Sequence, residues 1–490
     1  MIYNDIKNLI KYALHQNLLH IEDYNYAVNS LLTLLHLEDY QDNKIKKIIV
    51  DEPSTLLTPI LDYAVEQKII EVDTVLNRDL FEAKIMDTLI GRPSEVVNEF
   101  YSLYKESPQK ATNYYYNLSK KSNYIKTSRT DKNVTWKSGT SYGTIDMTIN
   151  LSKPEKDPLD IIASRNTKST NYPLCLLCKE NVGYSGRPGR TNHRIIPVTL
   201  NNEDFYLQYS PYVYYNEHSI VLMKDHNPMN VTDKTFRRLF DFTDQFPHYF
   251  LGSNAGLPIV GGSILSHEHY QGGSYHFPIE DAEILSTQTL NNITIKKLKW
   301  PLSVIRLEST NKEELINAAT SLYTYWEQYS NPDIDIVDKT TEPHNAITPI
   351  ARKEDNNYIL DMALRNNRTT KNYPLGIFHP HQENHNIKKE NIGLIEVMGL
   401  AVLPARLLHE LPMIEDAIKN STSLEKDNIH YNFTEDLKQI YNNEPIEEFV
   451  RKHVTIKFTK CLEDAGVFKQ DENSQTHFDT FISEFIKHIS

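Results

Sequence analysis

Apolar side chains recur at helical spacing through the first 124 residues of the chain, and glycine is almost absent from this stretch. The pattern includes Ile6, Leu9, Ile10, Ala13, Leu14, Leu80, Ile85 and Leu89. Such spacing places apolar side chains along one face of a helix. We therefore predict a helical N-terminal region over residues 1–135.

Polar and apolar residues begin to alternate at Ser141, which indicates a change to strands. A polar stretch at 120–137 predicts a linker before that change. Further strands are predicted at 205–209, 219–223, 259–260, 302–307 and 358–364, and helices at 233–246, 313–329 and within 447–489. Strands and helices thus mix in an α+β manner. The order after residue 301 echoes the order before it, so we predict two related units, 136–300 and 301–490.

The composition is that of an ordinary globular protein, with 490 residues of which 39% are hydrophobic and 24% charged. A formal charge of -13 argues against a non-specific nucleic-acid binder, which needs a broad basic surface. The N-terminus has no signal-peptide pattern, and no window approaches the roughly 20 apolar residues that span a bilayer. With only 3 Cys, a disulfide framework is not expected. We predict a cytoplasmic protein without a membrane partner.

Two histidines one residue apart, His267 and His269, lie within a run that begins and ends with paired glycines at 261–262 and 272–273. A neutral imidazole, with a usual pKa of about 6.5, is a competent nucleophile toward phosphorus at neutral pH. On a strand, His267, His269 and Gln271 would share one face, and the Gln271 amide could donate to a phosphoryl oxygen. Taken alone, a His-x-His motif fits two other interpretations as well as the catalytic one: histidines on a polar strand, or part of a metal site. The glycines weaken a strand interior and favour the catalytic interpretation.

Cys175 and Cys178 form a Cys-x-x-Cys unit whose spacing suits two thiolate ligands of zinc. His226 and His267 are the best candidates for the other two ligands, and the zinc would be structural. Two ordinary buried cysteines are the alternative interpretation. A redox pair is disfavoured because no thioredoxin-like βαβ pattern surrounds the unit.

A glycine-punctuated loop carries Arg187, Arg190 and Arg194 in an otherwise acidic chain. Arginine offers planar bidentate donors that suit phosphate, although a solvated basic loop explains the pattern equally well. A second His-x-His, His379 and His381, parallels the first and suggests either a second metal site or solvated loop residues.

Together these residues resemble the class II, bacterial galactose-1-phosphate uridylyltransferases, a family related to the histidine triad superfamily. The resemblance runs from about Tyr142 to Arg406. It rests on Cys-Leu-Leu-Cys-Lys-Glu-Asn-Val-Gly-Tyr, Asn-His-Arg, Gln-Tyr-Ser-Pro-Tyr-Val-Tyr-Tyr-Asn-Glu-His and Gly-Gly-Ser-Ile-Leu-Ser-His-Glu-His-Tyr-Gln. It implies that the two units are histidine triad-like halves with antiparallel sheets.

The resemblance also implies roles for individual residues. His269 would be uridylylated and Gln271 would contact the phosphoryl group, while Asn254 and Ser263 would contact substrate. The implied zinc ligands are Cys175, Cys178, His226 and His267. Glu268 departs from the class I pattern, which has proline at this position.

The implied reaction transfers UMP from UDP-glucose to galactose 1-phosphate in two displacements through a uridylyl-histidine, without an organic cofactor. A homodimer is implied as well. The alternative enzymes are a histidine triad nucleotide hydrolase and a dinucleoside phosphorylase, which would use the same histidine with water or phosphate as acceptor. A non-catalytic sugar-nucleotide-binding protein would keep the cysteines and the arginine loop but would not need His269.

Overall fold

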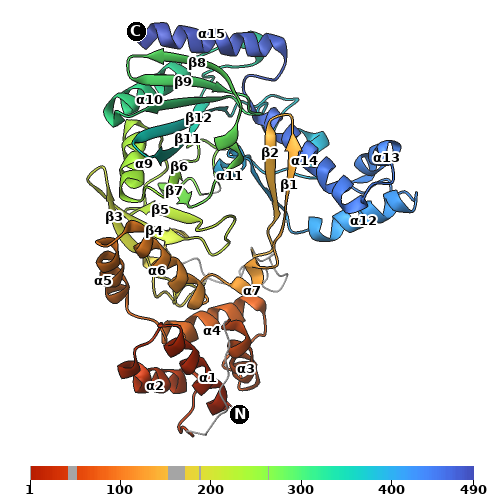
Figure 1. Ribbon diagram of the computed structural model, residues 1–490. Coiled ribbons are helices and arrows are strands. Elements are labelled where there is room, and N and C mark those ends of the chain that lie inside the picture. Colours follow the sequence, from red (N-terminus) through yellow and green to blue (C-terminus); the bar gives the residue numbers. More distant parts are fainter. Residues whose placement is uncertain (1, 42–51, 153–170, 187–188, 263, 490) are drawn as a thin grey trace.

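A computed structural model describes residues 2–41, 52–152, 171–186, 189–262 and 264–489, and its course is drawn in Figure 1. The N-terminal region is helical, as predicted. Its α-helices are α1 (Ile2–His15), α2 (Tyr24–Leu34), α3 (Ser54–Glu66), α4 (Val75–Asp87), α5 (Pro93–Tyr104), α6 (Pro108–Lys121) and α7 (Thr127–Thr130). The predicted linker at 120–137 is wrong, because α6 continues into it, α7 occupies its middle and β1 (Val134–Thr140) begins before it ends.

The body of the molecule is a ten-stranded sheet in which every neighbouring pair is antiparallel. Five strands come from the first half of the body: β3 (Ile196–Leu200), β4 (Glu203–Tyr209), β5 (Ser219–Met223), β6 (Phe250–Gly252) and β7 (His269–Gly273). Five come from the second: β8 (Ile284–Leu290), β9 (Ile293–Leu298), β10 (Val304–Ser309), β11 (Asn345–Glu354) and β12 (Asn357–Asn366). The antiparallel α+β architecture is therefore confirmed.

The two sets of five strands have the same topology. The spatial order is β3-β4-β5-β7-β6 in one set and β8-β9-β10-β12-β11 in the other, and the sets meet where β6 pairs with β11. A helix follows the third strand in each set, α9 (Asp233–Gln245) in the first and α10 (Lys312–Glu327) in the second. The order of strands and helices is therefore repeated along the chain because the same fold unit occurs twice.

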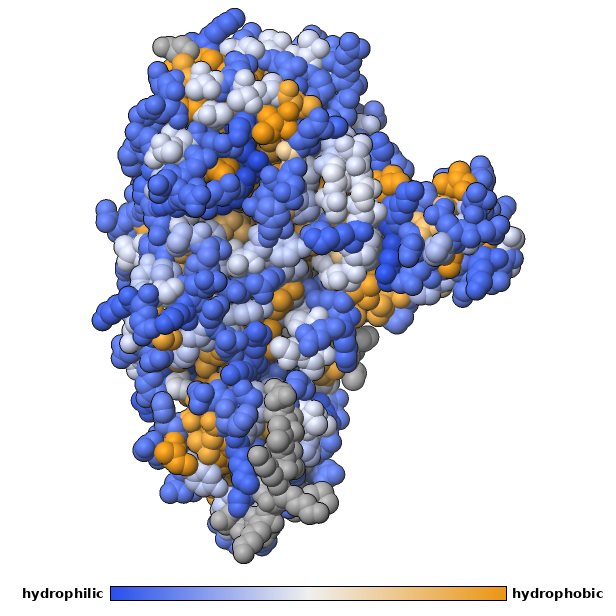
Figure 2. Space-filling view, in the orientation of Figure 1, coloured by the Kyte–Doolittle hydropathy of each residue, from blue (hydrophilic) through white to orange (hydrophobic). Residues whose placement is uncertain are grey.

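A second, three-stranded sheet joins segments far apart in the sequence. β2 (Gly143–Ile149) pairs with β1 and, in parallel, with β13 (Leu400–Leu403). Helices α12 (Leu407–Lys419), α13 (Tyr431–Ile440) and α14 (Ile446–Ala465) lie beside it and form an arm that projects from the body in Figure 1. Figure 2 shows apolar surface on this arm. The exposed apolar side chains of this part of the chain include Met413, Ile429 and Ile440.

Other predicted elements agree with the structure in most places. The helices predicted at 233–246 and 313–329 correspond to α9 and α10, and the C-terminal stretch forms α14 and α15 (Glu472–Ile489). The strand predicted at 259–260 is wrong, because Ile259 lies in a turn with φ of 73°. In the described ranges, no helix is long and apolar enough to cross a membrane.

Candidate active site

Four side chains from three separate segments meet beside the start of β7. Cys175 Sγ lies 3.6 Å from Cys178 Sγ and 3.3 Å from His267 Nδ1. Cys178 Sγ lies 3.2 Å from the Nδ1 atom of His226, which belongs to the loop after β5. The four ligand atoms are all within 4.8 Å of one another.

The four closest separations in this cluster, 3.2–3.8 Å, fit a tetrahedral zinc ion. Zn–S bonds of about 2.3 Å and Zn–N bonds of about 2.0–2.1 Å require ligand atoms roughly 3.3–3.8 Å apart. His267 presents Nδ1 to the cluster because its Nε2–H donates to the Met223 carbonyl at 2.8 Å, which sets the tautomer. Asn181 Nδ2 holds the cysteine turn by donating to the carbonyls of Cys175 and Cys178 at 2.9 and 2.8 Å. The four predicted ligands are thus brought together in an arrangement that can hold a metal.

His269 begins β7 and is buried, with 6% of its surface exposed. Its Nδ1–H donates to the carbonyl oxygen of His267 at 2.7 Å, which leaves the Nε2 lone pair free. Burial lowers the pKa of His269 to about 4, against the opposing effect of that hydrogen bond. The imidazole is therefore neutral at pH 7 and has one defined nucleophilic nitrogen.

Gln271 lies two residues along the same strand, so its side chain shares the face of His269. Its Oε1 accepts a hydrogen bond from His218 Nε2 at 3.2 Å. Burial lowers the pKa of His218 to about 4, so this partner stays a neutral donor. With its oxygen engaged by His218, the amide of Gln271 has its N–H groups available as donors.

A cavity of about 710 Å³ opens beside Gln271. Its polar wall residues include Asn254, Gln271, Lys388, Glu390, Asn391 and Glu396. Asn254 Oδ1 accepts from the Leu394 backbone N–H at 2.9 Å, and a side-chain carbon at Gly262 would lie 2.8 Å from Asn254 Nδ2. The glycine therefore leaves room for the asparagine, and Asn254 is the predicted substrate-binding residue found at this cavity.

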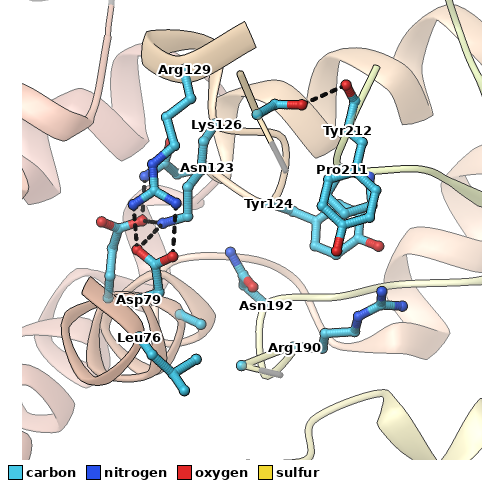
Figure 3. Close-up of a pocket in the computed structure, with 14 residues that line it drawn as sticks. Leu76, Asp79, Asn123, Tyr124, Lys126, Arg129, Arg190, Asn192, Pro211 and Tyr212 are labelled. Atoms are coloured by element: carbon cyan, nitrogen blue, oxygen red, sulfur yellow. Dashed lines mark hydrogen bonds and ion pairs between the residues drawn. The ribbon is translucent and has the colours of Figure 1, made fainter. Parts of the chain in front are cut away.

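The predicted arginine loop occupies a different place. Arg190 lines a smaller cavity of about 150 Å³ together with residues of the helical region, and its Nη1 donates to the Leu176 carbonyl at 2.9 Å. In Figure 3, Arg129 and Lys126 turn toward Asp79 on the opposite side of that cavity from Arg190. Arg194 does not line either cavity.

The guanidinium of Arg194 joins the sheet to the helical region. It donates to the carbonyls of Gly91, Thr191 and His193 and to the carboxylate of Asp87. The predictions for Arg187 and Ser263 lie outside the described residues.

His379 and His381 do not parallel the first His-x-His in position. They follow β12 in a loop, whereas the counterpart of β7 in the strand order is β12 itself. His379 Nδ1 lies 3.1 Å from the Pro380 carbonyl, and His381 contacts the Ile377 carbonyl and Asp464. Among the described residues, the only His, Cys and acidic cluster suited to a metal is the one at Cys175.

Comparison with known families agrees with this geometry. The model of the galactose-1-phosphate uridyl transferase N-terminal domain matches residues 18–228, and that of the C-terminal domain matches residues 242–435. The chain belongs to the galactose-1-phosphate uridylyltransferase family. The resemblance inferred from the motifs is thereby confirmed.

Curated members of the galactose-1-phosphate uridylyltransferase family align over nearly the whole chain. The Clostridium acetobutylicum protein is 50% identical over 99% of this chain and 100% of its own length. The Bacillus subtilis protein is 44% identical over 99% of this chain and 98% of its own. Among solved structures, a yeast Ap4A phosphorylase matches with a TM-score of 0.34 and 11% identity over 65% of this chain and 90% of its own, which is too low to establish a shared fold.

Two parts of this uridylyltransferase-family site were not assigned from sequence. His218 stands beyond an aromatic run, and only the folded sheet brings it to Gln271. Glu268 had no explanation, and the structure places its carboxylate against Arg238 of α9 and the hydroxyl of Tyr270. The one sequence signal for Glu268 was a charged residue between two histidines.

Proposed function

We propose that this chain transfers UMP from UDP-glucose to galactose 1-phosphate and that His269 carries the UMP between the two. The observation that carries the proposal is the state of His269: a buried, neutral imidazole with Nδ1–H committed to the His267 carbonyl at 2.7 Å. The curated relatives at 42–50% identity are named galactose-1-phosphate uridylyltransferases, which supports the choice of substrates.

In the first displacement, the Nε2 lone pair of His269 attacks the α-phosphorus of UDP-glucose. An N–P bond forms, the bond from the α-phosphorus to the bridging oxygen breaks, and glucose 1-phosphate leaves with that electron pair. The ring becomes positively charged, and the hydrogen bond from Nδ1–H to His267 stabilises that charge. No proton has to be removed from the nucleophile.

In the second displacement, a phosphate oxygen of galactose 1-phosphate attacks the same phosphorus. The N–P bond breaks, the electron pair returns to Nε2, and UDP-galactose is released. The amide N–H groups of Gln271 donate to the non-bridging oxygens as charge develops on them. His218 keeps the amide in this orientation by occupying Oε1.

The four-residue cluster holds a structural zinc ion in this proposal. The donor set of two thiolates and two imidazoles is one that zinc favours, and the ligand separations support it. Zinc would supply a rigid cross-link between the cysteine turn, the loop after β5 and the residues before β7. The chemical step itself needs only His269 and its neighbours.

The residues that line the cavity are candidates for contact with the substrate. Asn254 lines it beside Gln271 and is proposed to contact the substrate there. Arg187, Arg190, Arg194 and Ser263 stay predictions from the sequence. We also propose a homodimer, because the family resemblance implies one. A cytoplasmic location is proposed because paired zinc-binding thiolates suit a reducing compartment.

Intact-protein mass spectrometry after exposure to UDP-glucose tests the mechanism. The expected result is one UMP adduct per active site, mapped to the peptide containing His269, with an equal amount of glucose 1-phosphate released. Continuous release of UMP would instead favour a hydrolase, and adduct formation that only inorganic phosphate discharges would favour a phosphorylase. Binding without adduct or exchange would favour a sugar-nucleotide-binding protein.

A further inference from the structure

Glu268 stands between the two histidines of the site, yet its side chain is directed to neither the metal cluster nor the cavity. Its residue surface is 4% exposed, and its carboxylate lies between the start of β7 and helix α9. A buried carboxylate is costly to maintain unless it is fully paired and hydrogen-bonded. Its partners therefore indicate what it does.

The carboxylate has partners at both oxygens. Oε1 accepts from the Tyr270 hydroxyl at 2.8 Å and lies 3.4 Å from Arg238 Nη1, while Oε2 accepts from the Asn230 backbone N–H at 3.0 Å. Arg238 also donates to the Tyr270 hydroxyl at 2.9 Å. Its other side pairs with Glu203 of β4 at 2.7 Å. Helix, strand and loop are thus connected through one buried network.

The backbone of Glu268 makes two further connections. Its N–H donates to the Asn227 carbonyl at 2.6 Å, and its carbonyl accepts from the Met223 N–H at 2.9 Å. Asn227 and Asn230 belong to the loop that supplies the metal ligand His226. Glu268 therefore joins that loop to the strand on which His269 and Gln271 lie.

We propose that Glu268, held by Arg238, is a positioning residue for His269. It fixes the start of β7 against α9 and the loop at 224–232, so that the Nε2 atom of His269 keeps one direction relative to the cavity. This inference rests on the proposed function, in which that atom is the nucleophile. The direction of the His269 ring matters because a displacement of a reacting group by about 1 Å lowers the rate of the chemical step on the order of 10²-fold.

Replacement by an amide of the same shape, Glu268→Gln, tests the proposal. It removes the charge opposite Arg238 while keeping an oxygen for Tyr270 or Asn230. We expect kcat to fall about 10- to 100-fold and KM to stay within about twofold, because substrate contacts are untouched. The rate of UMP-adduct formation on His269 should fall by the same factor as kcat, with zinc content unchanged.

Arg238→Met removes the other partner, and the double variant tests the coupling. If Glu268 and Arg238 act together, the variant that carries both Glu268→Gln and Arg238→Met should have a kcat no lower than that of the slower single variant. The reason is that removing both charges leaves no unpaired buried ion. Tyr270→Phe is a milder probe that keeps the ring and loses only the hydroxyl. Arg237→Met is the matched control, since Arg237 is the preceding residue of α9 and its partner is the exposed Glu313.

Hydrogen–deuterium exchange of the same proteins without substrate gives a readout independent of the reaction. Glu268→Gln should raise exchange in peptides covering 224–232 and 264–273 and not elsewhere. A Glu268→Gln variant that forms the UMP adduct at the wild-type rate overturns the proposal. A variant whose rate falls only in proportion to a loss of zinc and of Tm overturns it as well. If the wild-type protein forms no adduct, the proposed function fails, and unchanged exchange at 264–273 then overturns the positioning role as well.

Discussion

The Nδ1 atom of His269 lies 2.7 Å from the carbonyl oxygen of His267, two residues earlier in the chain. One backbone carbonyl thus selects the tautomer of the neighbouring histidine, while the ring of His267 itself turns to Cys175. The short spacing of the motif puts a candidate metal ligand and a free imidazole nitrogen two residues apart on one chain segment.

His269→Ala should abolish sugar exchange, with a loss of at least ~10³-fold in kcat, because the change removes the imidazole that is proposed to attack the phosphorus. Steady-state exchange between UDP-glucose and galactose 1-phosphate measures the loss. The Tm should stay within a few degrees of wild type. His276→Ala is the control, since that histidine is three residues beyond β7 and exposed; exchange close to the wild-type rate in His269→Ala would refute the assignment.

Gln271→Ala should lower kcat by about 10²–10³-fold, as expected for loss of a donor to charge that develops in the transition state. His218→Phe should lower kcat less, by roughly 10-fold, because it frees the amide to rotate without removing it. In the double variant the losses should not add, since His218 acts only through Gln271. Additive losses would show that His218 acts by another route.

The purified protein should contain about one zinc ion per chain, measured by elemental analysis. Replacing Cys175 and Cys178 together with serine should remove the metal and lower the Tm, because the ion would join the three segments that carry Cys175, His226 and His267. Cys461→Ser is the matched control, as that cysteine is buried in α14, away from the cluster. Full activity in a metal-free double variant would contradict a structural zinc.

Gly262→Ala should raise KM, because the added carbon would lie 2.8 Å from Asn254 Nδ2 and displace that side chain from the cavity wall. Asn254→Ala should raise KM in the same direction. The two changes combined should have little more effect than either alone. A Gly262→Ala variant with wild-type KM for both substrates would argue against a role for Asn254 in binding.

The free energy of unfolding should depend on pH through His193. Burial first, then the charge of Arg190, lowers the pKa of His193 to about 3, against about 6.5 for an unfolded histidine. Between these values the unfolded chain binds the extra proton, so stability falls as the pH drops from about 6.5 toward 3, by up to about 1.4 kcal/mol per pH unit.

Urea unfolding at pH 7, 6 and 5 measures that dependence. His193→Gln should unfold with a shallower pH slope than wild type, because the titrating group is gone, although its absolute stability will be lower. His409→Gln, at an exposed position of α12, should leave the slope unchanged. Equal slopes in wild type and His193→Gln would contradict the lowered pKa.

Much of the fold could be predicted wherever one element gives a long periodic signal. The amphipathic N-terminal helices, α9 and α10 were predicted because each buries one face along many residues. Strand β8 was missed because it is almost wholly exposed and so carries little apolar pattern, and the short strands β3 and β9 were missed as well. The turn at Ile259 was mistaken for a strand because apolar residues also fill buried turns.

The candidate site also has a part that the sequence predicts and a part that depends on the folded structure. By itself, the sequence determined the chemistry: which residues have thiolate, imidazole and amide groups, and the one-residue spacing that separates His267 from His269. Only the tertiary structure decided that His218 and Arg238 belong to the site, because they reach it through strand pairing and helix packing that no local spacing encodes. Glu268 depends on this most, since a carboxylate beside two histidines has a role only once Arg238, Tyr270 and Asn230 surround it.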